Sequence, residues 1–143
     1  MPPERRPPRV LVVEDDPHIR DLVATRLELA GLHAFKANDG FEALVGLEAI
    51  RPDAMVLDLS MPGMDGLEVL RRMRQSSLIA RTPTMVLTAR NQPGDVKAAI
   101  ALGARDFLAK PFRDDQFLAR IARLLRRAPA PAGPARPKTV RLD

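Results

Sequence analysis

Acidic side chains follow the first apolar segment of the chain, where they could bind a metal ion. The apolar run Val10–Val13 leads directly into Glu14, Asp15 and Asp16. Carboxylates about 4 Å apart repel each other by roughly 4 kcal/mol per pair at an effective dielectric constant near 20, so such a cluster needs a compensating positive charge. Oxygen ligands without a thiol or an imidazole favour a magnesium-like cation.

Three later apolar segments also end in polar side chains. These are Asp58 with Ser60, then Thr88, and finally Lys110. Lys110 offers one positive charge to the acidic cluster, and a divalent cation would offer two more. Because Mg²⁺ usually keeps some of its waters and takes phosphate oxygens as ligands, the expected chemistry is a metal-assisted reaction of a phosphate group.

Alternating strands and helices must position these side chains. Apolar runs predict strands at 10–13, 32–37, 54–59, 84–89 and 106–110, and helical spacing marks the segments 17–31, 38–50, 67–75, 94–104 and 113–127. Apolar strands between amphipathic helices indicate a parallel sheet with helices on both faces. The carboxyl ends of parallel strands lie at one edge, where ligands bind at a topological switch point, so we expect the polar side chains to converge there.

The length and composition of the chain narrow its class. It has 143 residues, which fits one domain, and no cysteine, which excludes disulfides and thiolate metal sites. No apolar run approaches the roughly 20 residues of a membrane span, and the N-terminus lacks the apolar core of a signal peptide. We therefore expect a cytoplasmic protein without a membrane segment.

Proline-rich segments flank the alternating pattern. We expect a flexible arm over residues 1–8, a folded domain over 9–127 and a linker or tail over 128–143, which could lead to an output domain. No segment reads as a helix-turn-helix, so specific DNA binding by this chain itself is not expected.

Four motifs, LVVEDD, VLDLSMPGMDG, VLTA and KPF, occur in this order within residues 9–127. Together they resemble the receiver domain of a bacterial two-component response regulator. The resemblance implies a doubly wound α/β fold, with five parallel strands in the flavodoxin-like order 2-1-3-4-5. It also implies a phosphorylation-dependent signalling switch that catalyses only its own phosphorylation and dephosphorylation.

The resemblance gives the acidic residues their expected roles. Asp58 is the expected phosphoacceptor, which takes a phosphoryl group from the histidine of a sensor kinase. The expected ligands of Mg²⁺ (or Mn²⁺) are Asp15, Asp58, the backbone carbonyl of Ser60 and, through a bound water, Glu14.

The resemblance also implies a coupling between the site and an output surface. Lys110 is expected to pair with Asp58 and its phosphate, and Thr88 to donate a hydrogen bond to the phosphoryl group. Phe107 stands where the family usually has a switch aromatic, so Thr88 and Phe107 are the expected switch.

Many receivers that act in transcription form dimers through the face of their last strand and last two helices, so a homodimer is one expected partner. Asp106 and Arg120 could supply a charged pair on this face. Gln116 and Val96, however, stand where a matching acid and base are common, which places dimerisation by that route in doubt.

Two other functions are weighed against the signalling switch. A magnesium-dependent phosphatase on a similar sheet typically needs a second acid two residues after its nucleophile, and that position is Ser60. A purely structural interaction domain would not need the intact set Asp15, Asp58, Thr88 and Lys110. Two further acids, Asp16 and Asp65, are interpreted as helix N-caps rather than as ligands.

Overall fold

Five short strands pair in parallel in the computed structural model, which describes residues 6–126. They are β1 (Arg9–Val13), β2 (His33–Ala37), β3 (Ala54–Leu57), β4 (Thr84–Thr88) and β5 (Asp106–Ala109). The order β2-β1-β3-β4-β5 confirms the doubly wound topology predicted from the sequence. The direction of winding changes between β1 and β3, so the carboxyl ends of these two strands border the crevice in which such sheets bind ligands.

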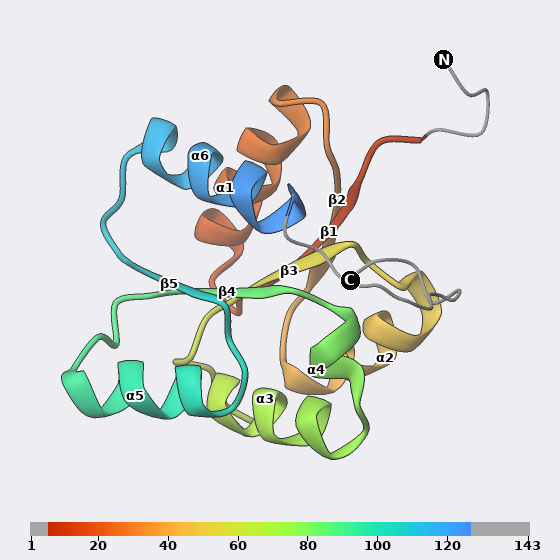
Figure 1. The fold of residues 1–143 in the computed structure, drawn as a ribbon. Coiled ribbons are helices and arrows are strands. Elements are labelled where there is room, and N and C mark those ends of the chain that lie inside the picture. Colours follow the sequence, from red (N-terminus) through yellow and green to blue (C-terminus); the bar gives the residue numbers. More distant parts are fainter. Residues whose placement is uncertain (1–5, 127–143) are drawn as a thin grey trace, which may run out of the picture.

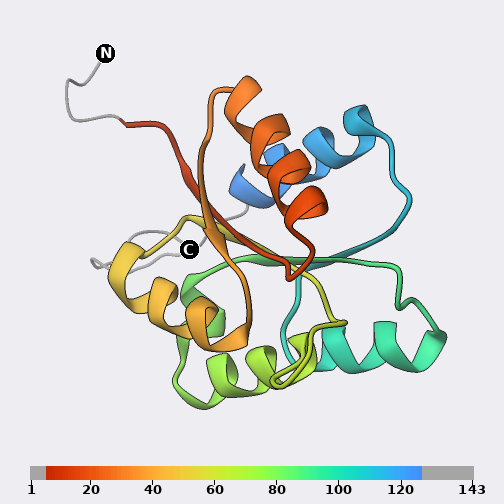
Figure 2. The ribbon, with the colours of Figure 1, turned by 180° about the vertical axis from the view of Figure 1, so that it is seen from behind.

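Helices cover both faces of this sheet. They are α1 (Pro17–Leu29), α2 (Gly40–Ile50), α3 (Gly66–Gln75), α4 (Leu78–Arg81), α5 (Pro93–Ala101) and α6 (Asp114–Arg126). Figures 1 and 2 show α1 and α6 on one face, and α2, α3 and α5 on the other. No helix within residues 6–126 has the length and apolar character needed to cross a lipid bilayer.

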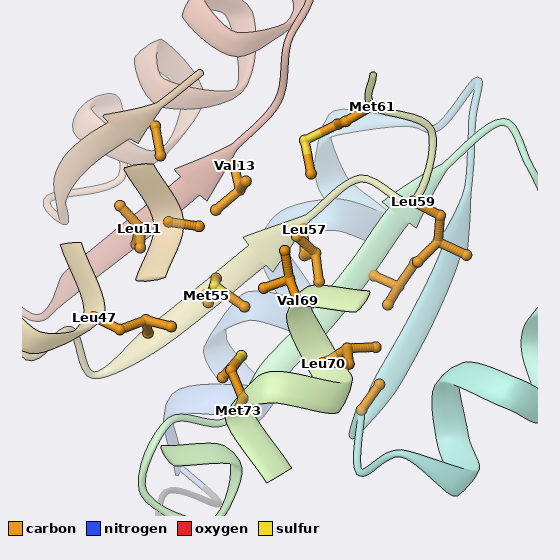
Figure 3. Close-up of a cluster of buried hydrophobic side chains, with 14 of the residues drawn as sticks. Leu11, Val13, Leu47, Met55, Leu57, Leu59, Met61, Val69, Leu70 and Met73 are labelled. Carbon is orange, nitrogen blue, oxygen red and sulfur yellow. The ribbon is translucent and has the colours of Figure 1, made fainter. Parts of the chain in front are cut away.

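Side chains of the strands alternate between two core layers. In β1, Val10 and Val12 belong to the layer under α1 and α6, whereas Leu11 and Val13 belong to the layer under α2 and α3. Figure 3 shows the second layer, in which Met55 lies near Val69 and Met73 of α3, and Leu11 lies on the side of Leu47 of α2. Because both faces are covered, β3 and β4 are buried along their whole length, which explains their continuous apolar sequences.

The ends of the first helix follow the signals in its sequence. Asp16 accepts hydrogen bonds from the backbone N–H groups of His18 and Ile19, so it is the N-cap that was predicted. Gly31 follows the helix with φ of 89°, a left-handed conformation that favours glycine. Asp65 likewise accepts from the N–H of Glu68 and caps α3, as predicted.

The structure differs from the sequence prediction in one added helix and, by one to three residues, in the bounds of most elements. The four-residue helix α4 was not predicted, because a single turn has too few residues to show helical periodicity. The strands β3, β4 and β5 end one or two residues earlier than expected, at Leu57, Thr88 and Ala109. The predicted tail at 128–143 and most of the predicted arm at 1–8 lie outside the described residues.

Candidate functional site

Backbone hydrogen bonds continue beyond the ends of the strands and hold the candidate residues at one edge of the sheet. Asp58 N–H donates to the carbonyl of Val13 at 3.1 Å, and Lys110 N–H donates to the carbonyl of Thr88 at 2.9 Å. Glu14 N–H donates to the carbonyl of Ala37 at 3.1 Å. The first residue after each of these strands is therefore fixed by the neighbouring strand rather than by its own loop.

Three carboxylates converge at this edge. Glu14, Asp15 and Asp58 each offer a carboxylate oxygen, and these oxygens lie within 4.8 Å of one another. Glu14 and Asp58 are buried, with 4% and 6% of their surface exposed, whereas Asp15 faces solvent. Such a set fits a hard divalent cation that retains waters on its open side.

Lys110 is the cation that the structure places among these acids. Its Nζ lies 2.6 Å from Glu14 Oε1 and 3.3 Å from Asp58 Oδ2, and 14% of its side chain is exposed. Burial raises the pKa of Glu14 to about 7, and the hydrogen bond from Lys110 opposes that rise. One ammonium faces three carboxyl groups, so the site has the electrostatic character that favours binding of a further cation.

Both oxygens of Asp58 have hydrogen-bond donors. Oδ1 accepts from the backbone N–H of Ser60 at 3.2 Å, and Oδ2 accepts from Lys110. These two contacts fix the orientation of the carboxylate at the end of β3. The expected role of the Ser60 carbonyl as a metal ligand stays a prediction.

Thr88 is fully buried at the end of β4. Its Oγ1 accepts a hydrogen bond from the backbone N–H of Arg90 at 3.1 Å. Since a hydroxyl can also donate one hydrogen bond, its proton is available to another acceptor. Phe107, on the adjacent strand β5, is partly buried and packs against the core layer under α2 and α3. The switch role of these two residues stays a prediction.

An ion-pair arrangement beside the site was not predicted from the sequence. Arg90 Nε donates to Asp95 Oδ1 at 2.9 Å, and Arg90 Nη1 donates to Asp65 Oδ2 at 3.3 Å. Asp95 belongs to a capping box with Gln92 at the start of α5. In the sequence, the spacing from Gln92 to Asp95 indicates a capping box at the start of a helix. It does not indicate that Asp95 pairs with Arg90.

Comparison with known proteins identifies relatives of the chain. The family model described as response regulator receiver domain matches residues 10–122. The transcriptional regulatory protein TrcR of Mycobacterium tuberculosis is 42% identical over 122 residues, which cover 85% of this chain and 47% of that protein. The response regulator MprA of Mycobacterium leprae is 44% identical over 119 residues, which cover 83% of this chain and 51% of that protein.

The solved structures give the same picture of the fold. The chemotaxis protein CheY4 of Vibrio cholerae matches with a TM-score of 0.77 and 34% identity, over 82% of this chain and 98% of that one. The receiver domain of the Francisella response regulator 1452 matches with a TM-score of 0.78 and 32% identity, over 84% and 98%. The chain thus spans nearly all of these structures but only about half the length of the curated relatives.

Proposed function

Because the chain belongs to the family of response regulator receiver domains, it is a signalling domain that switches on phosphorylation, and we propose that Asp58 is the residue that accepts the phosphoryl group. The observation that supports this proposal is the contact of Asp58 with Lys110, next to two further carboxylates at the carboxyl ends of the strands. The proposed donor is the phosphohistidine of a sensor kinase. The proposed domain runs from residue 9 to residue 127.

Transfer to Asp58 needs positioning and charge neutralisation more than covalent catalysis. A carboxylate oxygen of Asp58 forms a bond to phosphorus as the bond between phosphorus and a nitrogen of the protonated phosphohistidine ring breaks, which leaves an acyl phosphate and a neutral imidazole. Lys110 lies 3.3 Å from Asp58 Oδ2 and can neutralise charge on the transferred group. The N–H of Ser60 holds the other carboxylate oxygen.

The metal proposed for this site is Mg²⁺, with Mn²⁺ as a substitute. Glu14, Asp15 and Asp58 would hold it, since their oxygens lie within 4.8 Å of one another and include no soft ligand. A bound Mg²⁺ supplies positive charge that stabilises the transferring phosphoryl oxygens. The exposed position of Asp15 leaves a side of the site open for water and for the phosphodonor.

Thr88 and Phe107 form the proposed switch. A phosphoryl group on Asp58 adds strong acceptors near the end of β3, and the buried Thr88 hydroxyl has a proton available to donate. Movement of Thr88 toward those acceptors would change the packing around Phe107, on the strand that pairs with β4. The modification thereby shifts the population between two conformations.

The output of the switch is proposed from the relatives. One of them is named a transcriptional regulatory protein, and we infer that phosphorylation of this domain controls an output of that kind in a longer protein or a partner. Dimerisation through α5, β5 and α6 stays a prediction. Asp106 already pairs with Arg120 at 2.7 Å and with Arg123 at 3.2 Å within one chain, so a dimer would have to share or exchange these pairs.

Incubation with acetyl phosphate and Mg²⁺ tests the proposed function. Intact-protein mass spectrometry should show the addition of one phosphoryl group, and Asp58→Asn should abolish it. Asp53→Asn is the matched control, because Asp53 directly precedes β3 and so lies at the amino ends of the strands, away from the candidate site. Its carboxylate accepts a hydrogen bond from the backbone N–H of Arg9. Phosphorylation of Asp58→Asn would place the acceptor elsewhere, and release of inorganic phosphate without any phosphoprotein would support the phosphatase alternative.

A further inference from the structure

Arg90 connects the loop that follows Asp58 at the end of β3 with the loop that follows Thr88 at the end of β4. Its backbone N–H donates to Thr88 Oγ1, and its side chain donates to Asp95 Oδ1 and to Asp65 Oδ2. Asp65 lies in the loop after β3, and Asp58 is the first residue of that loop. Asp95 lies in the first turn of α5. The guanidinium is therefore a bridge between the segment that follows Asp58 and the segment that follows Thr88.

Both carboxylates of this bridge have a second structural role. Asp65 Oδ1 accepts from the N–H of Glu68 at 2.9 Å and caps α3. Asp95 Oδ2 accepts from the N–H of Gln92 at 3.2 Å at the start of α5. The caps fix the orientation of both acids, so the bridge by Arg90 joins two rigid helix ends rather than two mobile side chains.

This arrangement differs from an ordinary surface ion pair. Such pairs between long, exposed side chains contribute little, because holding both side chains costs conformational entropy. Here 16% of the Asp95 side chain, 36% of the Arg90 side chain and 37% of the Asp65 side chain are exposed. The difference is that one planar guanidinium serves two acids at once, and both acids are held as helix caps. Hydrogen bonds to Asp95 and Asp65 raise the pKa of Arg90 above its ordinary value, so the guanidinium is permanently charged.

We propose that Arg90 is a positioning residue for the phosphorylation switch: clamped between Asp65 and Asp95, it holds the loop after β4 in its unphosphorylated arrangement, and the clamp must open before Thr88 can reach a phosphoryl group on Asp58. This inference rests on the proposed function, because it takes Asp58 as the acceptor. We call Arg90, Asp65 and Asp95 the Arg90 clamp.

The contacts of Arg90 predict whether its removal favours or disfavours the phosphorylated arrangement. Arg90 is two residues from Thr88 and is bonded to its hydroxyl oxygen, so a movement of Thr88 toward Asp58 pulls on the backbone of Arg90. Contacts that exist in only one of two states favour that state, and their removal favours the other.

The test compares the affinity of variants for beryllofluoride, a phosphoryl mimic, in saturating Mg²⁺, measured by amide NMR. Arg90→Gln removes the charge but keeps the backbone N–H that bonds Thr88. It should bind beryllofluoride at least roughly two- to fivefold more tightly than wild type, because the two ion pairs of the clamp together contribute at least as much as one exposed pair. Arg81→Gln is the charge-matched control, because Arg81 is an exposed residue of α4 that precedes β4 at the opposite edge of the sheet.

Three more variants separate a clamp from a general effect of charge or stability. Asp95→Asn should also tighten binding, and the double variant with Arg90→Gln should bind no more tightly than the tighter single variant, since both changes open the same clamp. Arg90→Lys keeps a charge but cannot serve two carboxylates in one plane, so its change should be smaller than that of Arg90→Gln. A purely structural role would lower the melting temperature without tightening beryllofluoride binding.

The outcomes distinguish this inference from the proposed function. If Arg90→Gln binds beryllofluoride with the same affinity as Arg81→Gln, or more weakly, the clamp is wrong. Additive effects of Arg90→Gln and Asp95→Asn would also overturn it. If wild type neither binds beryllofluoride nor gains a phosphoryl group at Asp58, the proposed function itself fails.

Discussion

The ammonium of Lys110 lies 2.6 Å from a carboxylate oxygen of Glu14, a residue 96 positions earlier in the chain. This distance is shorter than the 3.3 Å between Lys110 and Asp58. Lys110 is thus shared by two buried acids that face a common site, and its hydrogen bond opposes the rise in the pKa of Glu14 that burial causes. The same residue therefore affects folding stability as well as the proposed phosphoryl transfer.

Replacing Lys110 by Met should destabilise the metal-free protein. Glu14 and Asp58 would lose their shared ammonium, and a buried charged group without a partner costs about 1–3 kcal/mol or more. Saturating Mg²⁺ should restore most of this loss, because the metal supplies the missing charge. Urea unfolding with and without Mg²⁺ measures both effects. Lys97→Met is the control, because Lys97 is exposed on α5, and an equal loss in both variants would contradict the assignment.

Asp15 and Asp16 allow a matched test of metal binding. Asp15 contributes an oxygen to the acidic group, whereas Asp16 caps α1 through its bonds to His18 and Ile19. Asp15→Asn should weaken Mg²⁺ binding at least about tenfold, since even changes in outer-shell partners of a metal cost 10- to 100-fold. Asp16→Asn removes the same charge and keeps a capping residue, so it should have a much smaller effect in a Mg²⁺ titration. Equal weakening would show that only the total charge matters.

Thr88→Ala should separate phosphorylation from the response to it. Asp58 should still accept a phosphoryl group, because its own contacts come from Ser60 and Lys110. The variant lacks the hydroxyl donor, a contact worth about 0.5–1.5 kcal/mol, so amide shifts of β5 around Phe107 on addition of beryllofluoride should be small. Thr88→Ser keeps the hydroxyl and should restore the shifts. A full wild-type response of Thr88→Ala would disprove the coupling.

Gly66 permits close packing under the loop that carries Asp58. A Cβ atom at Gly66 would lie 2.7 Å from Leu59 Cα and would also contact the carbonyl oxygen of Asp58. Gly66→Ala should therefore displace this loop, lower the free energy of unfolding by about 1–3 kcal/mol and slow phosphorylation. Gly94→Ala, in the first turn of α5, meets nothing within 4 Å and should stabilise the protein by about 0.4–1 kcal/mol. Urea unfolding of both variants measures the difference, and equal stabilities would contradict the packing argument.

The sequence predicted the fold because burial on both faces leaves a clear pattern. The continuous apolar runs of β3 and β4 result from helices on both sides of the sheet. The convergence of Glu14, Asp58 and Lys110 followed from the rule that parallel strands end at a common edge. Their roles in metal binding and phosphorylation came from the resemblance and stay predictions.

Other features depend on contacts that local sequence does not encode. The closer approach of Lys110 to Glu14 than to Asp58 is set by how the side chains fill a buried space. The bridge from Arg90 to Asp65 and Asp95 joins residues that have no common spacing or motif. The single turn of α4 is too short for a periodic pattern.

The position of β5 in the sheet affects when the candidate site is complete, because Lys110 directly follows β5. Within residues 6–126, β5 is an edge strand that pairs with β4 alone, yet it leads directly into Lys110. Among the five described strands it is the last to be synthesised, so Lys110 joins the chain after the acids that it contacts. Segments with few buried contacts open at a lower free energy than the core, so we expect loosening of β5 to remove Lys110 while the acids that follow β1 and β3 stay in place. The proposed site thus takes its ammonium from beyond a strand that is held on one side, and we expect loss of the pairing between β4 and β5 to disable the site while the rest of the sheet is still formed.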